Sequence, residues 1–267
     1  MVILKIYLPS DLNRAISTTT RQKIMFTTLC LDFGNTRLKW AIFSNDEIRH
    51  TGVLQENGVE DLKKCIEIYK PDRSILSSVV DHPIMIEEIL NNQTKFHKLD
   101  HHSRVPVTTP VGKPETIGAD RLALVVAASH YFPGVNNLVI GLGSAVTYNY
   151  INRFHQFIGG SISPGLEMRF KSLEVFTAKL PLIKPHWNFP LLGYDTKTNI
   201  RSGVLFGMAK EIDGVIEAYE ERYENLHVLM TGGDAHYFMP FLKKKISEDP
   251  VLIFKGLYVI SEFNFSI

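Results

Sequence analysis

The sequence predicts an α/β protein that consists of two related halves with a cleft between them. One strand–turn–strand pattern occurs twice, at Leu29–Lys39 and at Leu138–Tyr148, and each copy is an apolar strand that enters a glycine turn. Strands and helices mix in both halves, which is typical of α/β proteins. The chain has 267 residues, of which 45% are hydrophobic, so it is long enough to form two small domains with real cores.

Charge and composition exclude several functional classes. A formal net charge of +1 gives no electrostatic attraction to nucleic acid or to an anionic membrane. No apolar stretch approaches the length of a membrane span, and residues 1–24 lack the apolar core of a signal peptide. The two cysteines, Cys30 and Cys65, do not suggest a disulfide framework. We therefore expect a cytoplasmic protein that binds neither nucleic acid nor membranes.

The chain is predicted to have three parts. Residues 1–24 are expected to be a peripheral extension, because the strand that carries Asp32 begins at about Met25, which can itself be a start residue. Residues 25–134 are expected to form the first α/β domain and residues 135–267 the second.

The elements of the first half follow from hydrophobic spacing and from turn residues. Asn45-Asp46 predicts a hairpin turn between the second strand and the third. Helices are expected where apolar residues recur at helical spacing until a proline or glycine ends the pattern. The expected strands are 26–31, 38–43, 48–53 and 74–80, and the expected helices are 58–69, 83–90 and 120–131.

The second half repeats the mixture of strands and helices. A long helix is expected at 203–223, because Val204, Met208 and Ile212 begin one apolar stripe along it. The expected strands are 138–140, 146–151, 154–158 and 227–230, and the other expected helix is 166–178.

The first candidate site is the glycine turn after the first strand. Gly34 permits close approach of a ligand to the backbone, and Asn35 and Thr36 add side-chain donors. Lys39 supplies a charge suited to a phosphate, and Asp32 supplies a hard oxygen ligand for Mg²⁺. Taken alone, this motif is more often an ordinary hairpin turn.

A second glycine loop, Thr231–Asp234, follows a late apolar strand. Glycines at the end of a strand let a nucleotide base or ribose lie against the backbone, although a simple connecting loop has the same composition. A glycine turn in each half together with this loop is similar to the actin-like ATPase fold. That duplicated fold, with its interdomain cleft, is shared by actin, heat-shock chaperones, and acetate and sugar kinases.

Three further segments are candidates for parts of the site. Asp120 and Arg121 open a helix, where the helix dipole alone favours a carboxylate. A functional interpretation makes Asp120 a general base and Arg121 an anchor for an anionic substrate. The segments Gly159–Gly165 and Thr177–Pro181 are dense in glycine and proline, which indicates a shaped loop or only a connector.

These motifs together resemble the type III pantothenate kinases, also known as the Bvg accessory factor family. The matching segments run in order along the chain from about residue 25 to the C-terminal region. They are Asp32–Thr36, Gly118–Arg121, Gly159–Gly165, Thr177–Pro181, Thr196 with Ser202-Gly203, and Thr231–Gly233.

The resemblance implies an ATP-dependent phosphorylation of pantothenate, the first step of coenzyme A biosynthesis, by a homodimer. It implies that Asp120 is the base, that Asp32 helps to hold Mg²⁺, and that Thr196 reaches the site from the partner subunit. It assigns ATP binding to Asp32, Phe33, Gly34, Asn35, Thr36, Arg37, Leu38, Lys39 and Ser144. It assigns pantothenate binding to Val111, Gly118, Ala119, Asp120, Arg121 and Thr196.

The chain departs from this family at three positions. Gly141 and Asn149 replace two carboxylates of the second turn motif, and Val111 stands where many members have an aromatic residue. The family binds its monovalent cation, K⁺ or NH₄⁺, at the position of Gly141, so we expect this cation site to be lost or altered. The missing carboxylates favour an alternative, a catalytically impaired regulatory protein on the same fold. A third interpretation is a sugar or acetate kinase, because a fold does not determine a substrate.

Overall fold

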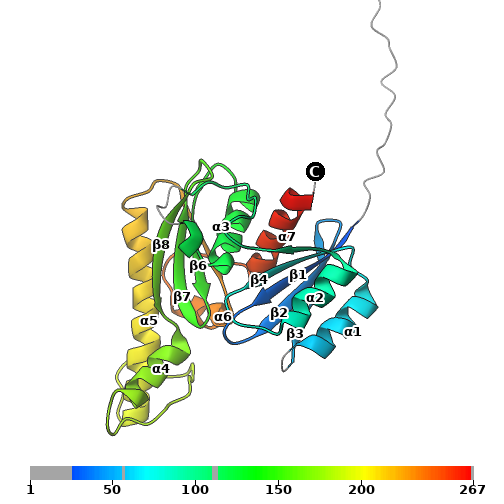
Figure 1. The fold of residues 1–267 in the computed structure, drawn as a ribbon. Helices are drawn as coiled ribbons and strands as arrows, with labels where there is room; N and C mark the ends of the chain where they lie inside the picture. Colours follow the sequence, from blue (N-terminus) through cyan, green and yellow to red (C-terminus); the bar gives the residue numbers. More distant parts are fainter. Residues whose placement is uncertain (1–25, 56–57, 110–113, 266–267) are drawn as a thin grey trace, which may run out of the picture.

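The computed structural model describes residues 26–55, 58–109 and 114–265 (Figure 1). The expected extension at residues 1–24, the start at Met25 and the expected substrate residue Val111 lie outside the described residues.

The first sheet has five strands in the order β3-β2-β1-β4-β5 (Figure 1). The strands β1, β2 and β3 are antiparallel neighbours, whereas β4 and β5 run parallel to β1. Asn45 and Asp46 both have positive φ, so the expected hairpin turn joins β2 to β3. The bounds are β1 (Thr27–Phe33), β2 (Leu38–Ser44), β3 (Glu47–Leu54), β4 (Arg73–Ser78) and β5 (Lys95–Lys98).

The second sheet repeats this topology, in the order β10-β9-β6-β7-β8. The strand β6 pairs antiparallel with β7 and parallel with β9, as β1 does with β2 and β4. The predicted α/β class and the duplication are therefore confirmed. The bounds are β6 (Asn136–Leu142), β7 (Ala145–Ile151), β8 (Phe157–Pro164), β9 (Leu226–Thr231) and β10 (Ser247–Glu248).

Helices and sheets form five layers (Figure 1). The outer face of the first sheet is covered by α1 (Val59–Tyr69) and α2 (Ile84–Gln93). The outer face of the second sheet is covered by α4 (Leu166–Val175), α5 (Thr196–Glu220) and α6 (Ala235–Phe238). Between the sheets lie α3 (Ala119–Tyr131) and α7 (Leu252–Phe265), and two 3₁₀ turns, Pro114–Thr116 and Met239–Phe241, complete the described helical elements.

The central layer determines where the site forms. The helix α3 is buried without interruption from Leu122 to Ser129, because it packs against α7, β6 and β7 at the same time. The helix α7 follows the second sheet in the chain but packs on β1 and β4 of the first. The N-terminal end of α3, which carries Asp120, is therefore held between the two sheets.

Several elements differ from the sequence-based expectation. The strand β8 runs through Gly159-Gly160 to Pro164, although the expected strand ended at residue 158. The helix α5 begins at Thr196 rather than at residue 203, because Asp195 caps it by accepting a hydrogen bond from Thr198 N–H at 2.7 Å. The helix expected at 166–178 ends at Val175. The elements β5, β10, α6 and α7 had not been predicted.

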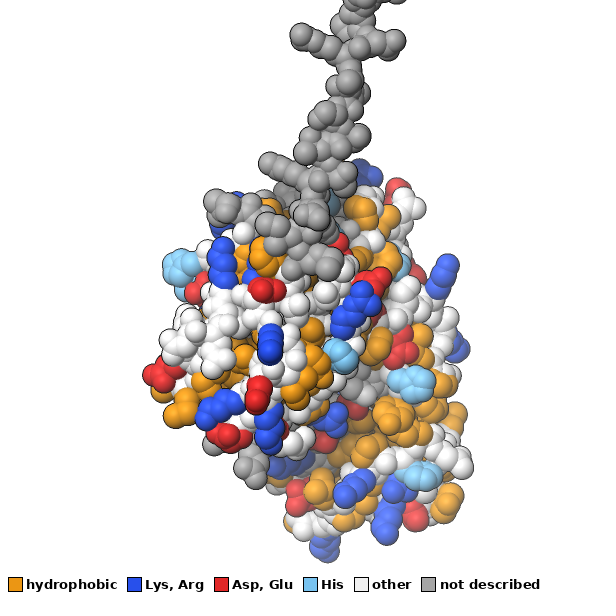
Figure 2. Space-filling view, turned by 90° about the vertical axis from the view of Figure 1, so that its right-hand side faces the viewer, with side chains coloured by type: hydrophobic (Ala, Val, Ile, Leu, Met, Phe, Trp, Pro, Cys, Tyr) orange, Lys and Arg blue, Asp and Glu red, His pale blue; other side chains and the backbone are white. Residues whose placement is uncertain are grey.

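The surface agrees with the low net charge. On the face that Figure 2 shows, basic and acidic side chains are interspersed, without a patch of one sign among the described residues. None of the described helices has the combination of length and apolar character that crossing a membrane requires.

Candidate active site

Asp32 lies near the end of β1 on the inner face of the first sheet. Strand alternation decides this, because Cys30 belongs to the core between the sheets whereas Leu31 and Phe33 belong to the outer core. Asp32 pairs with Lys39 on β2 and with Ser77 on β4, so these three side chains share the inner face. The strand therefore presents one carboxylate on the inner face of the sheet, between a lysine and a serine.

The surroundings of Asp32 make its charge unfavourable in the metal-free protein. Burial raises the pKa of Asp32 to about 6, with a further upward effect from the carboxylate of Asp120 and an opposing effect from Lys39. The helix α3 thus brings Asp120 close enough for its charge to act on Asp32. A divalent cation beside Asp32 would stabilise its negative charge. It would thereby offset both the cost of burying the carboxylate and its repulsion from Asp120.

The two glycine turns meet between the two sheets. In the first turn Gly34 N–H donates to Arg37 O at 3.2 Å, and in the second Gly143 N–H donates to the Ala145 carbonyl at 3.1 Å. The hydroxyl oxygens of Thr36 and Ser144 lie 2.8 Å apart. The turns that follow β1 and β6 are therefore joined by a hydrogen bond, although they are 108 residues apart in the chain.

The Thr231–Asp234 loop packs against the second turn. Gly232 has φ +110° and lies so close to Leu142 that a Cβ atom on it would be 2.1 Å from the Leu142 carbonyl oxygen. Asp234 lies near Arg37 of the first turn: burial and Glu167 raise the pKa of Asp234, and Arg37 opposes this shift. All three glycine loops that the sequence singled out converge here.

The substrate residues expected on α3 lie at its first turn. Gly118 is the N-cap residue and Ala119 the first residue of the helix, followed by Asp120 and Arg121. Arg121 Nε donates to Asn149 Oδ1 on β7 at 2.6 Å, and its guanidinium lies 5.8 Å from the centre of the Phe157 ring. Burial lowers the pKa of Arg121, while Asp120 and Tyr219 act in the opposite direction.

Asn149 fixes the orientation of this arginine. Its amide nitrogen donates to Val139 O at 3.2 Å and to Thr147 Oγ1 at 3.1 Å, which leaves its oxygen for Arg121. Because Asn149 is neutral, the positive charge of Arg121 is not neutralised from this side and remains available to an anion.

Thr196 is not brought to this cluster within one chain. It is the first residue of α5, whereas Tyr219, which lies close enough to Arg121 to influence its pKa, is 23 residues further along the same helix. At 1.5 Å per residue, this separation is about 35 Å. Thr196 instead borders a cavity of about 610 Å³ between α4 and α5.

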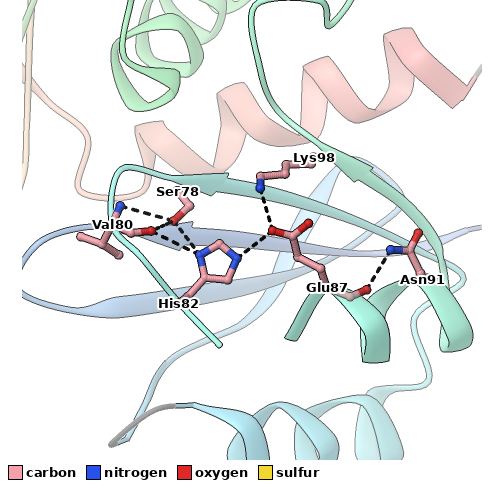
Figure 3. Close-up of polar contacts among 6 residues, drawn as sticks. All are labelled: Ser78, Val80, His82, Glu87, Asn91 and Lys98. Atoms are coloured by element: carbon pink, nitrogen blue, oxygen red, sulfur yellow. Dashed lines mark hydrogen bonds and ion pairs between the residues drawn. The ribbon is translucent and has the colours of Figure 1, made fainter. Parts of the chain in front are cut away.

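A second cavity of about 690 Å³ opens beside the first turn, between Gly34–Leu38 and the loop that joins β4 to α2. His82 of that loop packs edge-on against Phe33, with the ring centres 5.5 Å apart. Figure 3 shows how this histidine is held: its Nδ1 lies 3.1 Å from Ser78 Oγ, and its Nε2 lies 2.9 Å from Glu87 Oε1. Lys98 donates to the same Glu87 oxygen at 2.7 Å. His82 lines one wall of the cavity, and the sequence analysis had not identified the network that holds it.

Few side chains at this place could bind a hard metal ion such as Mg²⁺. Among the described residues no cluster of three or more His, Cys, Asp or Glu side chains could hold a metal by itself. Asp32 could therefore contribute only one protein ligand to Mg²⁺, with phosphate oxygens and waters supplying the others.

Solved structures with similar folds agree with this architecture. A Baf family protein from Campylobacter jejuni, described as a conserved candidate transcriptional activator, has a TM-score of 0.57 at 22% identity and covers 90% of this chain and all of its own. A candidate 2-dehydro-3-deoxygalactonokinase from Sinorhizobium meliloti has a TM-score of 0.58 at 11% identity, over 90% of this chain and 97% of its own. The fold is therefore the duplicated actin-like ATPase fold that the sequence predicted.

Sequence comparison identifies the family. A family model described as type III pantothenate kinase matches residues 28–218. A type III pantothenate kinase from Cytophaga hutchinsonii is 39% identical over 88% of this chain and 99% of its own length. One from Bacteroides fragilis is 37% identical over 88% of this chain and 98% of its own. The chain belongs to the type III pantothenate kinase family.

Proposed function

We propose that the protein transfers the γ-phosphoryl group of ATP to the hydroxyl of pantothenate, forming 4'-phosphopantothenate in the first step of coenzyme A biosynthesis. The observation that carries this proposal is the convergence of Asp32, Asp120 and Arg121 with three glycine loops at one cleft. It supplies a phosphate cradle, a base and an anion anchor within one site. Membership of the kinase family supports the same activity.

The first turn would bind the phosphates. Backbone N–H groups of Asn35–Arg37 and the ammonium of Lys39 offer donors, and the Ser144 hydroxyl approaches from the second turn. Mg²⁺, which accompanies ATP in kinases, would neutralise the developing phosphate charge, and Asp32 is the residue of this turn that would hold it.

Asp120 would take the proton from the attacking hydroxyl. Its place in the first turn of α3 aims a carboxylate at the cleft beside Asp32. Arg121, held by Asn149, would bind the pantothenate carboxylate and so fix the hydroxyl for in-line attack. Gly118 and Ala119 would line the same pocket with backbone atoms.

The residues at the family's monovalent-cation position do not fit a cation. Gly141 has no side chain, and a Cβ atom there would lie 2.7 Å from Thr147 Oγ1. That oxygen already accepts a hydrogen bond from Asn149 Nδ2 at 3.1 Å. The Thr147 hydroxyl, hydrogen-bonded to Asn149, therefore occupies the space beside Gly141 where a carboxylate side chain would begin, and we infer that turnover needs neither K⁺ nor NH₄⁺.

A homodimer would complete the site. Four large apolar side chains are more than 60% exposed on the segment between α4 and α5, namely Phe176, Leu191, Leu192 and Tyr194. Such a patch beside Thr196 suits a second copy of the chain. Because Thr196 is too far from Arg121 along α5, it would serve the pantothenate site of the partner.

The proposal keeps two domains, residues 25–134 and 135–267, each built on one of the two sheets, with ATP between them, although α3 and α7 pack across this boundary. A cytoplasmic location suits a kinase that uses ATP. The alternative of an impaired regulator is not favoured, because Asp32, Asp120 and Arg121 are all retained at one cleft. The family match also argues against a sugar or acetate kinase.

The direct test is formation of phosphopantothenate from Mg-ATP and pantothenate by the purified protein. Asp120→Asn is the matched control, because it keeps the size of the side chain and removes the base. Turnover in the wild type and its loss in this variant are expected. Absence of turnover in folded wild-type protein would overturn the proposal.

A further inference from the structure

Two buried side-chain hydroxyls of the described residues have no hydrogen-bond partner, Thr28 Oγ1 and Ser77 Oγ. Both residues are 0% exposed. An unpaired buried hydroxyl destabilises the folded protein, so each needs an explanation. Their positions relative to the cleft distinguish the two.

Ser77 lies beside Asp32. The two residues pair in the parallel register of β1 and β4, so their side chains leave the same face of the sheet on adjacent strands. Thr28 lies on the same face of β1 but four residues before Asp32, which is about 13 Å from it along the strand. Only Ser77 is at the catalytic end of the sheet.

The other serines of β4 are paired, which sets Ser77 apart. Ser78 Oγ donates to Val80 O at 2.8 Å, and Ser74 Oγ lies 2.5 Å from Thr94 Oγ1. Ser77 Oγ also makes no hydrogen bond to the Asp32 carboxylate, although the two residues are neighbours. Its hydroxyl therefore does not serve to hold Asp32 in the metal-free protein.

An unpaired oxygen next to a partly exposed carboxylate suits a hard cation. Two oxygens on opposite sides of Mg²⁺ are about 4.2 Å apart, which is too far for a hydrogen bond but right for an ion between them. A serine can also re-aim its oxygen by rotation about a single bond. Phosphate-binding loops of other NTPases place a serine or threonine hydroxyl on Mg²⁺ for the same chemical reason.

We propose that Ser77 Oγ is a second protein ligand, beside Asp32, of the magnesium ion. It would contact the ion directly or through one of the waters bound to the ion. The proposal rests on the proposed function, because the ion is the one that accompanies ATP. Ser77 would be a binding residue that completes the site on the side of β4, opposite Lys39.

The test measures how much Mg²⁺ strengthens the binding of ADP. ADP affinity is determined by calorimetry with excess Mg²⁺ and again in EDTA, for wild type, Ser77→Ala and Thr28→Val. Ser77→Ala is expected to lose about ten- to a hundredfold of the Mg²⁺-dependent gain, with ADP affinity in EDTA unchanged. Thr28→Val is the matched control, since it removes the other unpaired hydroxyl, and it should behave as wild type.

Folding is checked independently by thermal unfolding. Both variants remove an unpaired buried hydroxyl, so neither midpoint should fall. Ser77→Cys is a second variant that keeps the volume and replaces the hard oxygen with a soft sulfur, and it should lose the Mg²⁺-dependent gain as Ser77→Ala does.

If Ser77→Ala keeps the full Mg²⁺-dependent gain in ADP affinity, or if Thr28→Val loses as much of it, the assignment of Ser77 is overturned. Turnover by the wild type would still leave the proposed function intact. Wild-type protein that neither binds ADP nor phosphorylates pantothenate would overturn both.

Discussion

The hydroxyl oxygens of Thr36 and Ser144 lie 2.8 Å apart and join two turns that occupy corresponding places in the two sheets. One turn follows β1 and the other follows β6. Phosphate groups that bind here must either accept hydrogen bonds alongside the existing Thr36–Ser144 contact or break that contact. The pair is therefore both a link between the halves and a part of the expected ATP site.

We predict that Thr36 and Ser144 are energetically coupled. Thr36→Ala and Ser144→Ala should each raise the KM for ATP, and the double variant should cost less than the sum of the single changes. The expected coupling is about 0.5–1.5 kcal/mol, the usual net value of a neutral hydrogen bond. Steady-state kinetics of the four proteins measures it, with the KM for pantothenate as the control that should not change. Strict additivity would show that the bond does not contribute to ATP binding.

Asp32→Asn should stabilise the metal-free protein at pH 8. The pKa of Asp32 is raised to about 6 in the folded protein from its ordinary value of 3.8. The charged carboxylate therefore destabilises the folded state above pH 6, and this cost disappears as the pH falls from 6 to below 4. The gain in the free energy of unfolding should be on the order of 1–3 kcal/mol at pH 8 and close to zero at pH 4. Denaturant unfolding in EDTA at both values measures it.

The same experiment in an Asp120→Asn background provides the control. Removing the Asp120 charge lowers the pKa of Asp32 toward its usual value, because Asp120 is one of the causes that raise it. The gain from Asp32→Asn should therefore be smaller in that background. An equal gain in both backgrounds would contradict the interaction between these two carboxylates.

The general architecture could be predicted because its signals are local. The apolar strands and the glycine turns at Gly34 and Gly143 can each be recognised from a few consecutive residues. The duplicated topology follows from the repetition of this pattern. The helix α7 could not be predicted in this way, because apolar residues occupy most of its positions and leave no clear helical stripe. The start of α5 was missed because glycines in its interior obscured it, although Asp195 and Thr198 form a capping box.

The candidate site was predicted where chemistry and motif coincide, as at Asp32, Asp120 and Arg121. Ser77 was not predicted, because a serine at a strand end has no signature until the register beside Asp32 and the missing partner are known. The network around His82 was missed for a similar reason, since Lys98 and Glu87 belong to different elements.

Arg121→Lys should weaken pantothenate binding selectively. Lysine keeps the charge but loses the Nε donor that bonds Asn149 at 2.6 Å, together with the fork that matches a carboxylate. We expect the KM for pantothenate to rise about tenfold, equivalent to about 1.4 kcal/mol, with little change in the KM for ATP. An equal rise in both KM values would indicate a general disturbance of the cleft instead.

Turnover should be the same in buffers that contain K⁺, NH₄⁺ or only a bulky organic cation. The reason is the replacement of a carboxylate by Gly141 and the hydrogen bond from Asn149 to Thr147 in the same place. Initial rates at saturating Mg-ATP and pantothenate test this directly. Activation of the wild type by K⁺ would show that other oxygens form a cation site.

Mixed dimers should recover activity from two inactive parents. If Thr196 serves the partner's site, Asp120→Asn and Thr196→Val damage different residues of each shared site. Thr196 is exposed and takes no part in the hydrogen bonds that cap α5, so its replacement should leave the helix intact.

In a hybrid dimer one site carries both changes and the other carries neither. Subunits mixed in equal amounts and exchanged should therefore regain roughly a quarter of wild-type turnover, because half of the dimers are hybrids with one intact site. Leu192→Glu, placed on the exposed apolar segment, should prevent both dimer formation in sedimentation and this recovery. Hybrids without activity would mean that each subunit uses its own Thr196 or none.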